Sequence, residues 1–358
     1  MTNKYILPAE WDSVDGILFA WPHKDTDWAY MLDEIIDCYI EMIRAITRHT
    51  SVVIIGPDTE VIRQTVVNAG MPDIRRIDIR EVATNDTWIR DYGVITTKNS
   101  DSGRFTFNDF CFNGWGLKFA ADLDNLVTSY LYKRRCFANG KYANRLNFVL
   151  EGGSIESDGI DTILTTSRCL LSPNRNGISD KRKAEAALCR YLGAKRVLWL
   201  DHGFLAGDDT DSHIDTLARF ASPDTIMYVK CYDRTVQHYA ELSAMERELN
   251  LMRRADGTPY KLVPLPLPDP VYDKDNGERL PATYANFLII GEQAVIVPTY
   301  GQADKDAQAV HAIQEVFPHH CIECVDASAL IRQHGSIHCA TMQIPHGALR
   351  FLQLSTIQ

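Results

Sequence analysis

The chain has 358 residues, of which 45% are hydrophobic, and a formal net charge of −10. This length suits either two average domains or one large α/β domain with a substantial core. The acidic balance, with Lys and Arg scattered along the chain, argues against nucleic-acid binding. The sequence shows neither an apolar run of about 18 residues nor the pattern of a secretory leader, so we expect a cytoplasmic protein that does not enter a membrane.

Helix-like and strand-like segments alternate from the start of the chain. Residues 28–48 carry apolar side chains at helical spacing, and we expect the preceding Asp25-Thr26 pair to cap this helix. The apolar run 51–57 predicts a buried strand, 58–70 predicts a helix closed by Gly70, and 75–82 alternates like a half-buried strand. Together these segments form a strand–helix–strand unit.

Similar units recur along the rest of the chain. Residues 179–201 predict a helix followed by a strand, and 233–252 predict another helix. Residues 294–301, 303–317 and 321–327 predict a further strand–helix–strand unit. This alternation indicates the α/β class, and no low-complexity linker interrupts it, so we expect one domain over 1–358. The proline-rich stretch 261–281 predicts an edge strand and a long surface loop that could act as a lid.

Cysteine usage gives no sign of bridges or of a metal centre. Nine cysteines in a chain without a leader predict reduced thiols. Cys321 and Cys324 form one Cys-x-x-Cys pair after His319 and His320, but no second ligand pair accompanies them, and the segment alternates like a strand. We therefore predict no metal site.

Small polar signatures recur about every 50 to 70 residues, a spacing within the range of repeated supersecondary units. They are WIRDYG (88–93), EGGSIE (151–156), DSHID (211–215), YAN (284–286) and GSIHC (335–339). Each lies at the edge of an apolar, strand-like run. Polar side chains at the ends of several strands are a common way to build a site.

Three of these signatures offer acidic or basic groups. If DSHID is extended, His213 and Asp215 point to the same side, where the carboxylate could orient the imidazole. The alternative is an ordinary surface turn, because the segment is rich in turn-forming residues. Glu151 ends an apolar run before two glycines, which suits either a ligand-facing carboxylate or an ordinary strand-terminal Glu. Asp91 lies in NDTWIRDYG, beside Trp88 and a turn-permitting glycine.

Cys339 is either one more buried thiol or a nucleophile that needs a nearby base. Its neighbour His338 would project to the opposite side of an extended segment, so we expect His338 to face away and to pack or hydrogen-bond structurally. His213 is the better partner, because catalytic pairs are normally neighbours in space rather than in sequence.

Taken together, seven blocks resemble those of agmatine deiminases, in the peptidylarginine deiminase-like branch of the guanidine-modifying enzymes. The blocks are WPHKDTDW (21–28), NDTWIRDYG (85–93), FNGWG (112–116), LEGGSIESDG (150–159), DTDSHID (209–215), YANF (284–287) and GSIHC (335–339). The resemblance covers residues from about 8 to 345. It implies a five-bladed α/β propeller of the pentein type around a central channel, an arrangement that periodicity alone would not have chosen over a doubly wound sheet.

The resemblance also implies roles for individual residues. Cys339 corresponds to the nucleophile, His213 to the general acid and base, and Asp91 and Asp215 to the carboxylates that hold the guanidinium. The further positions that it assigns are Glu151 as another active-site acid, Trp88, Trp115 and Asn286 as pocket residues, and Asp209 as a partner for the distal amine.

The implied reaction converts agmatine to N-carbamoylputrescine and ammonia through a thiouronium on the cysteine. It needs no metal and no organic cofactor, and the resemblance implies a homodimer.

The chain departs from the agmatine deiminase pattern at Tyr92, in RDYGV rather than RDTGP, and at Glu156, where many members have His. The Tyr92 form also occurs in the peptidyl branch. That branch, however, has arginines for a peptide carboxylate near the position of FNGWG, and none stands here, so we favour agmatine over C-terminal peptidyl arginine. Deimination of another guanidine, such as free arginine, and a non-catalytic propeller that serves as a binding module remain the alternatives.

Overall fold

A computed structural model of the protein describes residues 5–351, and within that range the strands form five sheets of three or four strands and one two-stranded hairpin. The first sheet contains β19 (Met342–Pro345), β2 (Val14–Ala20), β3 (Ser51–Gly56) and β4 (Ile77–Glu81), and the second contains β1 (Tyr5–Ile6), β5 (Ile95–Asn99), β6 (Phe105–Cys111) and β7 (Gly140–Val149). The other three are β8 (Ile155–Ser157), β9 (Thr162–Thr166) and β10 (Arg196–Leu200); β11 (Ala218–Ser222), β12 (Thr225–Lys230) and β13 (Lys261–Pro266); and β16 (Leu288–Ile290), β17 (Ala294–Thr299) and β18 (Cys321–Asp326). The hairpin is β14 (Val271–Tyr272) with β15 (Arg279–Leu280).

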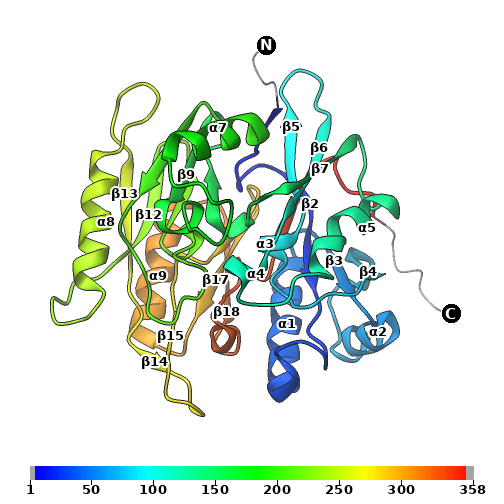
Figure 1. The fold of residues 1–358 in the computed structure, drawn as a ribbon. Coiled ribbons are helices and arrows are strands. Elements are labelled where there is room, and N and C mark those ends of the chain that lie inside the picture. Colours follow the sequence, from blue (N-terminus) through cyan, green and yellow to red (C-terminus); the bar gives the residue numbers. More distant parts are fainter. Residues whose placement is uncertain (1–4, 352–358) are drawn as a thin grey trace.

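All five sheets share one pairing pattern. An antiparallel pair, such as β5–β6 or β16–β17, is followed by a parallel pair, such as β6–β7 or β17–β18. The parallel pairs are joined by helical crossovers, as parallel strands require. The helices that serve these crossovers are α1 (Leu32–Thr47), α2 (Thr59–Asn68), α4 (Gly114–Leu117), α5 (Val127–Lys133), α6 (Ser167–Leu170), α7 (Lys181–Leu192), α8 (Tyr239–Leu251) and α9 (Ala303–Val316). The predicted α/β class is confirmed (Figure 1).

Local sequence explains the strongest elements. The run SVVIIG of β3 is buried along almost its whole length, as expected for a parallel strand covered on both faces. The helix α1 buries Ile35, Tyr39 and Ile43 completely, on a stripe of helical period. Asp58 caps α2 by accepting hydrogen bonds from the amides of two residues in its first turn.

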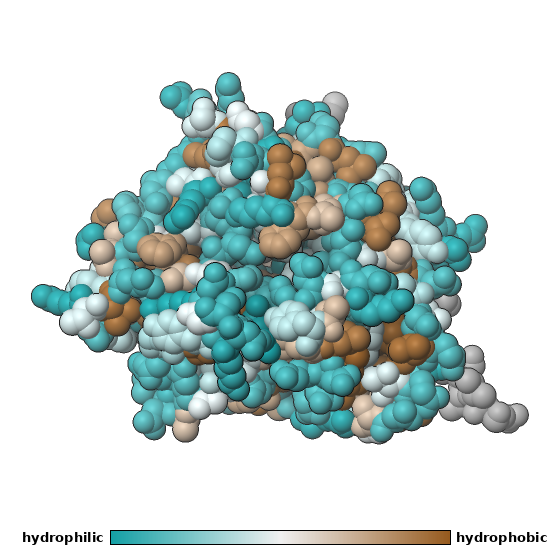
Figure 2. All heavy atoms as spheres, turned by 60° about the horizontal axis from the view of Figure 1, so that its bottom comes forward, coloured by the Kyte–Doolittle hydropathy of each residue, from teal (hydrophilic) through white to brown (hydrophobic). Residues whose placement is uncertain are grey.

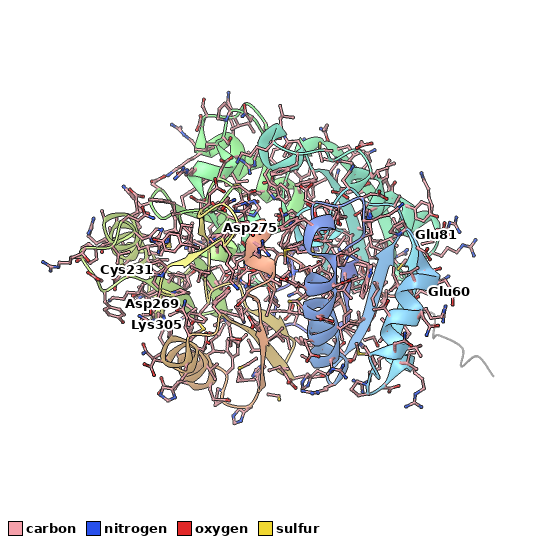
Figure 3. The ribbon with its side chains drawn as sticks, turned by 90° about the horizontal axis from the view of Figure 1, so that it is seen from below. Glu60, Glu81, Cys231, Asp269, Asp275 and Lys305 are labelled. Atoms are coloured by element: carbon pink, nitrogen blue, oxygen red, sulfur yellow. The ribbon has the colours of Figure 1, made fainter. Side chains whose placement is uncertain are left out.

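The connections between sheets meet near the centre of the molecule. Viewed from below, successive stretches of the chain occupy successive sectors around that centre (Figure 3). The connections are the short helix α3 (Ile89–Tyr92) before β5, the turn η4 (Gly152–Ser154) before β8, the turn η5 (Ile214–Thr216) before β11, residues 284–287 before β16, and residues 335–341 before β19. Each of the five polar signatures of the sequence lies at one of these connections.

Some predicted boundaries are wrong. The helix expected from residue 28 begins at Leu32, after a 3-10 turn over Ala29–Met31. Neither Asp25 nor Thr26 caps it, because the Thr26 hydroxyl donates to the carbonyl of His23 instead. The helix expected from residue 233 begins at Tyr239. Gly70, with φ of 63°, follows the end of α2 as predicted.

The proline-rich stretch 261–281 contains β13, which is the edge strand of its sheet as predicted, and the hairpin β14–β15. Arg332 of the 3-10 helix η6 (Leu330–Gln333) donates to Asp273 at 3.1 Å and also to Asp275 of this hairpin. Asp275 lies near the centre of the lower face (Figure 3). The hairpin is therefore tied to the segment that precedes GSIHC, and its role as a lid stays a prediction.

Hydrophilic side chains cover most of the face in Figure 2, and apolar ones are scattered over it. Isolated apolar residues of this kind are normal on a protein surface, so this face does not by itself indicate a dimer interface. The predicted homodimer stays a prediction. Within residues 5–351, no helix has the length and apolar character that a membrane crossing requires.

Candidate active site

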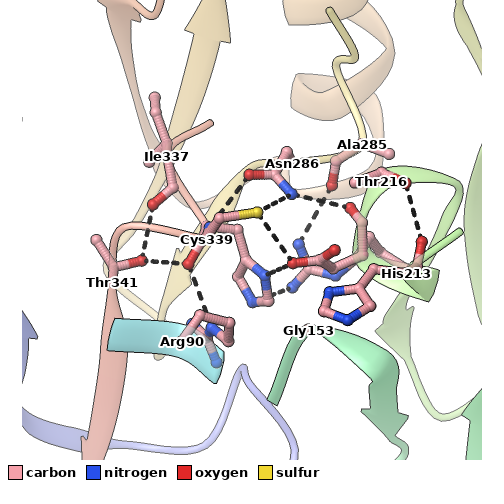
Figure 4. Close-up of polar contacts among 12 residues, drawn as sticks. Arg90, Gly153, His213, Thr216, Ala285, Asn286, Ile337, Cys339 and Thr341 are labelled. Carbon is pink, nitrogen blue, oxygen red and sulfur yellow. Dashed lines mark hydrogen bonds and ion pairs between the residues drawn. The ribbon is translucent and has the colours of Figure 1, made fainter. Parts of the chain in front are cut away.

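Cys339 lies in a buried turn over residues 335–341 rather than in a strand. The amide of Ala340 donates to the carbonyl of Ser336 at 3.2 Å, and that of Thr341 donates to the carbonyl of His338 at 3.1 Å. The Asn286 side chain holds the cysteine from one side (Figure 4): its Oδ1 accepts from the Cys339 amide at 3.2 Å, and its Nδ2 donates to Sγ at 3.3 Å.

The turn changes the prediction for His338. An extended segment would have directed its ring away from Cys339, but both side chains of this turn reach Asp215. Cys339 Sγ lies 3.6 Å from Asp215 Oδ2, and His338 Nδ1 lies 2.8 Å from the same oxygen. The expectation that His338 faces away from the site is therefore wrong.

His213 and Asp215 come together through a different geometry from the one predicted. Asp211 and Ser212 both have φ near 65°, in the left-handed region, and Ile214–Thr216 form a 3-10 turn. The segment DSHID is thus not extended. Two successive left-handed residues other than glycine are rare, and such backbone strain is concentrated at functional sites.

Gly153 marks the point where three of these groups meet. A Cβ atom at this residue would lie 2.7 Å from His213 Nδ1, 2.9 Å from Asp91 Oδ1 and 3.0 Å from Asp215 Oδ2. These distances are shorter than ordinary contacts allow, so only glycine fits here. The Gly153 amide donates to Asp91 Oδ1 at 2.9 Å, which orients that carboxylate toward the centre.

Asp91 is held on its other oxygen by Trp115, whose Nε1 donates to Oδ2 at 2.8 Å. Trp115 itself has φ of 51°, another left-handed residue beside the site. The Trp88 ring packs closely against the nucleophile turn, because a Cβ at Gly335 would lie only 2.3 Å from it. Both predicted tryptophans therefore shape the site.

Glu151 is completely buried behind His213, whose Nε2 lies 3.3 Å from its Oε2. Arg175 donates from Nε to both carboxylate oxygens, at 3.1 and 2.8 Å, and from Nη1 to Asp211 at 2.6 Å. The pKa of Glu151 is lowered: burial alone would raise it, but the hydrogen bond with His213 and the Arg175 charge outweigh burial. Glu151 thus presents a fixed negative charge to the imidazole.

Two buried polar atoms at this centre have no hydrogen-bond partner among the described residues, namely His213 Nδ1 and Asp215 Oδ1. Buried polar atoms are nearly always paired in native proteins, so unpaired ones at one point indicate a ligand position. The two atoms are an imidazole nitrogen and a carboxylate oxygen. A planar cation with N–H groups meets the acceptor oxygen well.

Burial and charge set the protonation of the central groups. The pKa of Cys339 is raised well above its ordinary value, first by burial and then by the negative charges of Asp215 and Asp91. Burial would lower the pKa of His213, but Asp91 and its other neighbours raise it well above the ordinary value. The pKa of Asp91 is raised by burial, although the His213 charge opposes this. At neutral pH the site thus holds a thiol and an imidazolium.

A narrow cavity of about 20 Å³ leads to Cys339. Its lining residues are Asp27, Asp86, Trp88, Asp91, Trp115, Phe119, Asp209, Thr210, Thr216, Gln333, His334, Gly335 and Cys339. No lysine or arginine stands among these lining residues, which all lie in the described part of the chain. The cavity is therefore acidic with aromatic walls. The predicted residues Trp88, Trp115 and Asp209 line it, and Asn286 contacts the thiol beside it.

In the described part of the chain, three groups of side chains have ligand atoms close enough to share a metal ion, namely Glu151 with Cys169 and His213, Glu10 with Glu156 and His338, and His49 with Cys321 and Glu323. Each has an arginine bonded to one of its carboxylates, and a guanidinium there opposes a second cation. Cys324 does not join Cys321 in any of them. The absence of a metal site remains a prediction.

The structure brings together all nine predicted site residues, and it adds groups that the sequence did not reveal. Arg175 stands alone in a loop of turn-forming residues, and nothing in its surroundings distinguishes it. Glu10, Arg219 and His338 lie behind Asp215 and are bonded to one another. Glu156 was visible only as a departure from the family pattern, and it pairs with the buried Arg219.

The α/β fold and a buried thiol among an imidazole and carboxylates define an enzyme of the guanidine-modifying class. The chain belongs to the family of Porphyromonas-type peptidyl-arginine deiminases, which matches residues 6–345. The family resemblance read from the seven sequence blocks is thus confirmed.

Several solved structures are similar over almost the full chain. A Porphyromonas gingivalis protein named "Putative Arginine Deiminase" is 46% identical, with a TM-score of 0.90, covering 97% of this chain and 100% of that one. A cysteine-to-serine variant of the C. jejuni agmatine deiminase with substrate bound is 36% identical, with a TM-score of 0.86 and 97% of each chain covered. The Enterococcus faecalis agmatine deiminase is 29% identical, with a TM-score of 0.86 and 96% of each chain covered.

Proposed function

We propose that the protein hydrolyses agmatine to N-carbamoylputrescine and ammonia, and that Cys339 is its nucleophile. The observation that carries this proposal is the acidic cavity beside Cys339. Agmatine has a guanidinium at one end and an ammonium at the other, so it needs anionic or neutral contacts along its whole length. Two relatives named agmatine deiminase cover nearly the full chain, which supports the same substrate.

The outer part of the cavity suits an ammonium group. The pKa of Asp86 is raised to about 7, first by burial and then by the charges of Asp27 and Asp209, although the hydrogen bonds with Thr87 oppose this. Burial likewise raises the pKa of Asp209 to about 6. Carboxylates that repel one another in this way are stabilised by a cation placed among them. Trp88, within the same cavity, offers an apolar wall for the methylene chain.

Arginine fits this cavity less well. Its α-carboxylate would lie among the carboxylates that surround the distal end, and within residues 5–351 no lysine or arginine side chain lines that region. The nearby Lys118 instead donates to the backbone carbonyl of Asp209 and to the Asp211 carboxylate at 3.1 Å. A like charge brought into a partly buried site is strongly disfavoured, which supports agmatine over free or peptidyl arginine.

In the proposed reaction, Asp91 and Asp215 hold the guanidinium N–H groups and fix its carbon beside Sγ. Once substrate has lowered the pKa of the Cys339 thiol, the thiol proton passes to solvent; a bond then forms between the Sγ thiolate and this carbon, and the bond to one terminal nitrogen breaks. That nitrogen leaves as ammonia with a proton from His213. Water, deprotonated by the now neutral His213, then attacks the thiouronium carbon, the C–S bond breaks, and the ureido product and the thiol are released.

Substrate itself assists the formation of the thiolate. In the free site, the negative charges of Asp91 and Asp215 hold the pKa of Cys339 high, after the effect of burial. A guanidinium bound between the two carboxylates neutralises them and adds a positive charge next to Sγ. Binding therefore lowers the pKa of the thiol when it is needed.

For the architecture we propose one domain, a five-bladed α/β propeller of the pentein type. The repeated pairing pattern of five sheets supports it, and so does the placement of the site at the connections between them. The strand β19, from the C-terminal end, pairs with β2 from the N-terminal end, an arrangement suited to closing a ring.

The function is tested by measuring ammonia release from agmatine, free L-arginine and a peptide with C-terminal arginine. We expect kcat/KM for agmatine to exceed that for the other two substrates by at least about 100-fold. The cavity offers no favourable partner for the carboxylate that each of those two substrates carries. Equal or faster turnover of either arginine substrate would refute agmatine as the substrate. Inactivity with every guanidine would favour the binding module instead.

Substitution of Asp209 tests the proposed contact with the ammonium group at the distal end of agmatine. We expect Asp209→Asn to raise KM for agmatine by about 10-fold and to leave kcat nearly unchanged, because the charged contact acts equally in ground and transition states. Butylguanidine, which lacks the amine, should show no such change. The control variant Asp269→Asn alters the net charge equally, at an exposed residue away from the centre in Figure 3. An equal KM increase for both compounds would contradict the assignment.

A further inference from the structure

The ring of His338 is almost completely buried directly behind the active site, with a carboxylate at each nitrogen. Nδ1 lies 2.8 Å from Asp215 Oδ2, and Nε2 lies 2.8 Å from Glu10 Oε2. The pKa values of both carboxyl groups are lowered. Burial would raise each of them, but the charge of Arg219 for Glu10 and the hydrogen bond from His338 for Asp215 outweigh it. Both groups are therefore ionised, and Asp215 Oδ2 accepts the hydrogen of the ring Nδ1.

The ring therefore donates from Nδ1 to Asp215 Oδ2. Its other nitrogen, Nε2, lies 2.8 Å from Glu10 Oε2 and 3.1 Å from Arg219 Nη2, so these two side chains hold the far side of the ring. A hydrogen bond to an ionised carboxylate is strong and has a fixed direction.

Glu10 is itself anchored, so it can fix the ring from behind. Its Oε1 accepts from the Ile289 amide at 2.7 Å, and its Oε2 accepts from Arg219. Arg219 in turn donates to the carbonyls of Ala285 and Phe287, at 3.2 and 2.6 Å. These two residues flank Asn286, which holds the nucleophile. The cluster therefore ties Asp215 and Cys339 to one rigid support.

The contact with His338 decides which oxygen of Asp215 is free. Oδ2 is occupied by the imidazole, while Oδ1 is buried and without a partner among the described residues. If the carboxylate rotated, the guanidinium would meet an oxygen at a different position relative to Sγ. A displacement of about 1 Å between the reacting groups can lower the rate by about 100-fold.

We propose that His338 is a positioning residue for the deimination: it holds Asp215 through Oδ2 so that Oδ1 faces the guanidinium, and Glu10 fixes the ring from the other side. This inference rests on the proposed function, since it assigns a role within the same site. It goes beyond the residues assigned from the family resemblance, among which His338 has no part.

The charges around Asp215 allow a pH test of this role. The ionisable and charged groups that act on it are His338, His213, Arg219, Arg90, Asp91 and Cys339. Burial has the largest effect on the pKa of Asp215 and raises it. The hydrogen bond from His338 has the next largest effect and lowers it. Without that bond, burial dominates and the pKa rises. The ionised carboxylate binds substrate, so activity falls when Asp215 becomes protonated. In a variant without the bond, this acid-side loss of activity would occur at a higher pH than in the wild-type protein.

Two substitutions separate positioning from packing. In His338→Asn the side-chain amide stands near the former Nδ1 and still donates to Asp215, whereas in His338→Gln it reaches toward Glu10 instead. We expect kcat/KM for agmatine to fall by about 30- to 100-fold in His338→Gln and by less than about 5-fold in His338→Asn. The acid limb of the pH profile should move to higher pH in His338→Gln and stay nearly in place in His338→Asn.

A packing role predicts something different. Both variants remove the ring, so melting temperatures should fall by similar amounts, and activity would follow stability. Equal losses of kcat/KM in the two variants, or an unmoved acid limb in His338→Gln, would overturn the proposal.

A measurement on the wild-type protein decides the matter if a variant does not fold. In protein with ¹⁵N-labelled histidine, the assigned ring signals of His338 should show a hydrogen on Nδ1 at neutral pH, and a bare Nδ1 on His338 would overturn the proposal. This readout needs no activity. A wild-type protein without ammonia release from agmatine would therefore refute the proposed function while leaving the test of His338 intact.

Discussion

We expect Cys339→Ser to lower kcat for agmatine by about 10⁴-fold or more while leaving the fold intact. The serine hydroxyl ionises far less readily than a thiol, and this site already opposes negative charge by burial and by two carboxylates. Serine is nearly isosteric, and the Asn286 amide can still donate to its oxygen. Ammonia release measures activity, and thermal melting should change by only a few degrees.

Cys136→Ser is the matched control, because Cys136 is equally buried but follows α5, outside the cavity. It should retain wild-type kcat. Mass spectrometry of acid-quenched wild-type protein should find the thiouronium adduct on the peptide that contains Cys339, and Cys339→Ser should still bind agmatine with Kd within about 10-fold of the wild-type KM. Full activity of Cys339→Ser, or an adduct on another cysteine, would refute the nucleophile.

The local elements could be predicted where the pattern is strong. The apolar run of β3 and the helical stripe of α1 each determine their own structure, because burial follows directly from the period. The pairing of strands that are distant in sequence could not be predicted. The contact of β19 with β2 joins segments more than 300 residues apart, and nothing in either short strand specifies its partner.

The candidate site was found through the set of blocks, and the local geometry assumed for two of them was wrong. Alternation in DSHID suggested an extended segment, but the left-handed backbone at Asp211 and Ser212 brings His213 and Asp215 inward. Non-glycine residues adopt this conformation only when tertiary contacts impose it, so no propensity predicts it. The same holds for the turn that directs both His338 and Cys339 toward Asp215.

Buried charge was the other feature hidden from the sequence. Arg175 and Arg219 look like ordinary surface arginines in their local context, yet each is buried against carboxylates of the site. Pairing of this kind depends on which segments meet at the centre, and it is therefore decided by topology rather than by neighbours in sequence.

His213→Gln is the second substitution expected to abolish most activity, with kcat for agmatine lower by about 10³-fold. Despite burial, Asp91 and its other neighbours raise the pKa of His213 well above its ordinary value, so the ring is an acid at neutral pH. In the proposed reaction, that acid protonates the departing nitrogen, which leaves as ammonia. It is lost as the pH rises through the raised pKa, so wild-type kcat/KM should fall on the alkaline side. Gln fills similar space but carries no transferable proton.

An altered leaving group separates the two roles of His213. In the S-methylisothiourea analogue of agmatine, methanethiolate leaves instead of ammonia and needs less protonation, while the thiouronium formed on Cys339 is the same. We expect His213→Gln to release about one equivalent of methanethiol per enzyme in a burst and then to stall, because no base activates the hydrolytic water. The adduct should be visible by mass spectrometry. Steady turnover of the analogue without a burst would assign the water to another base, and the Glu151→Gln variant would then show whether that base is the carboxylate 3.3 Å behind the imidazole.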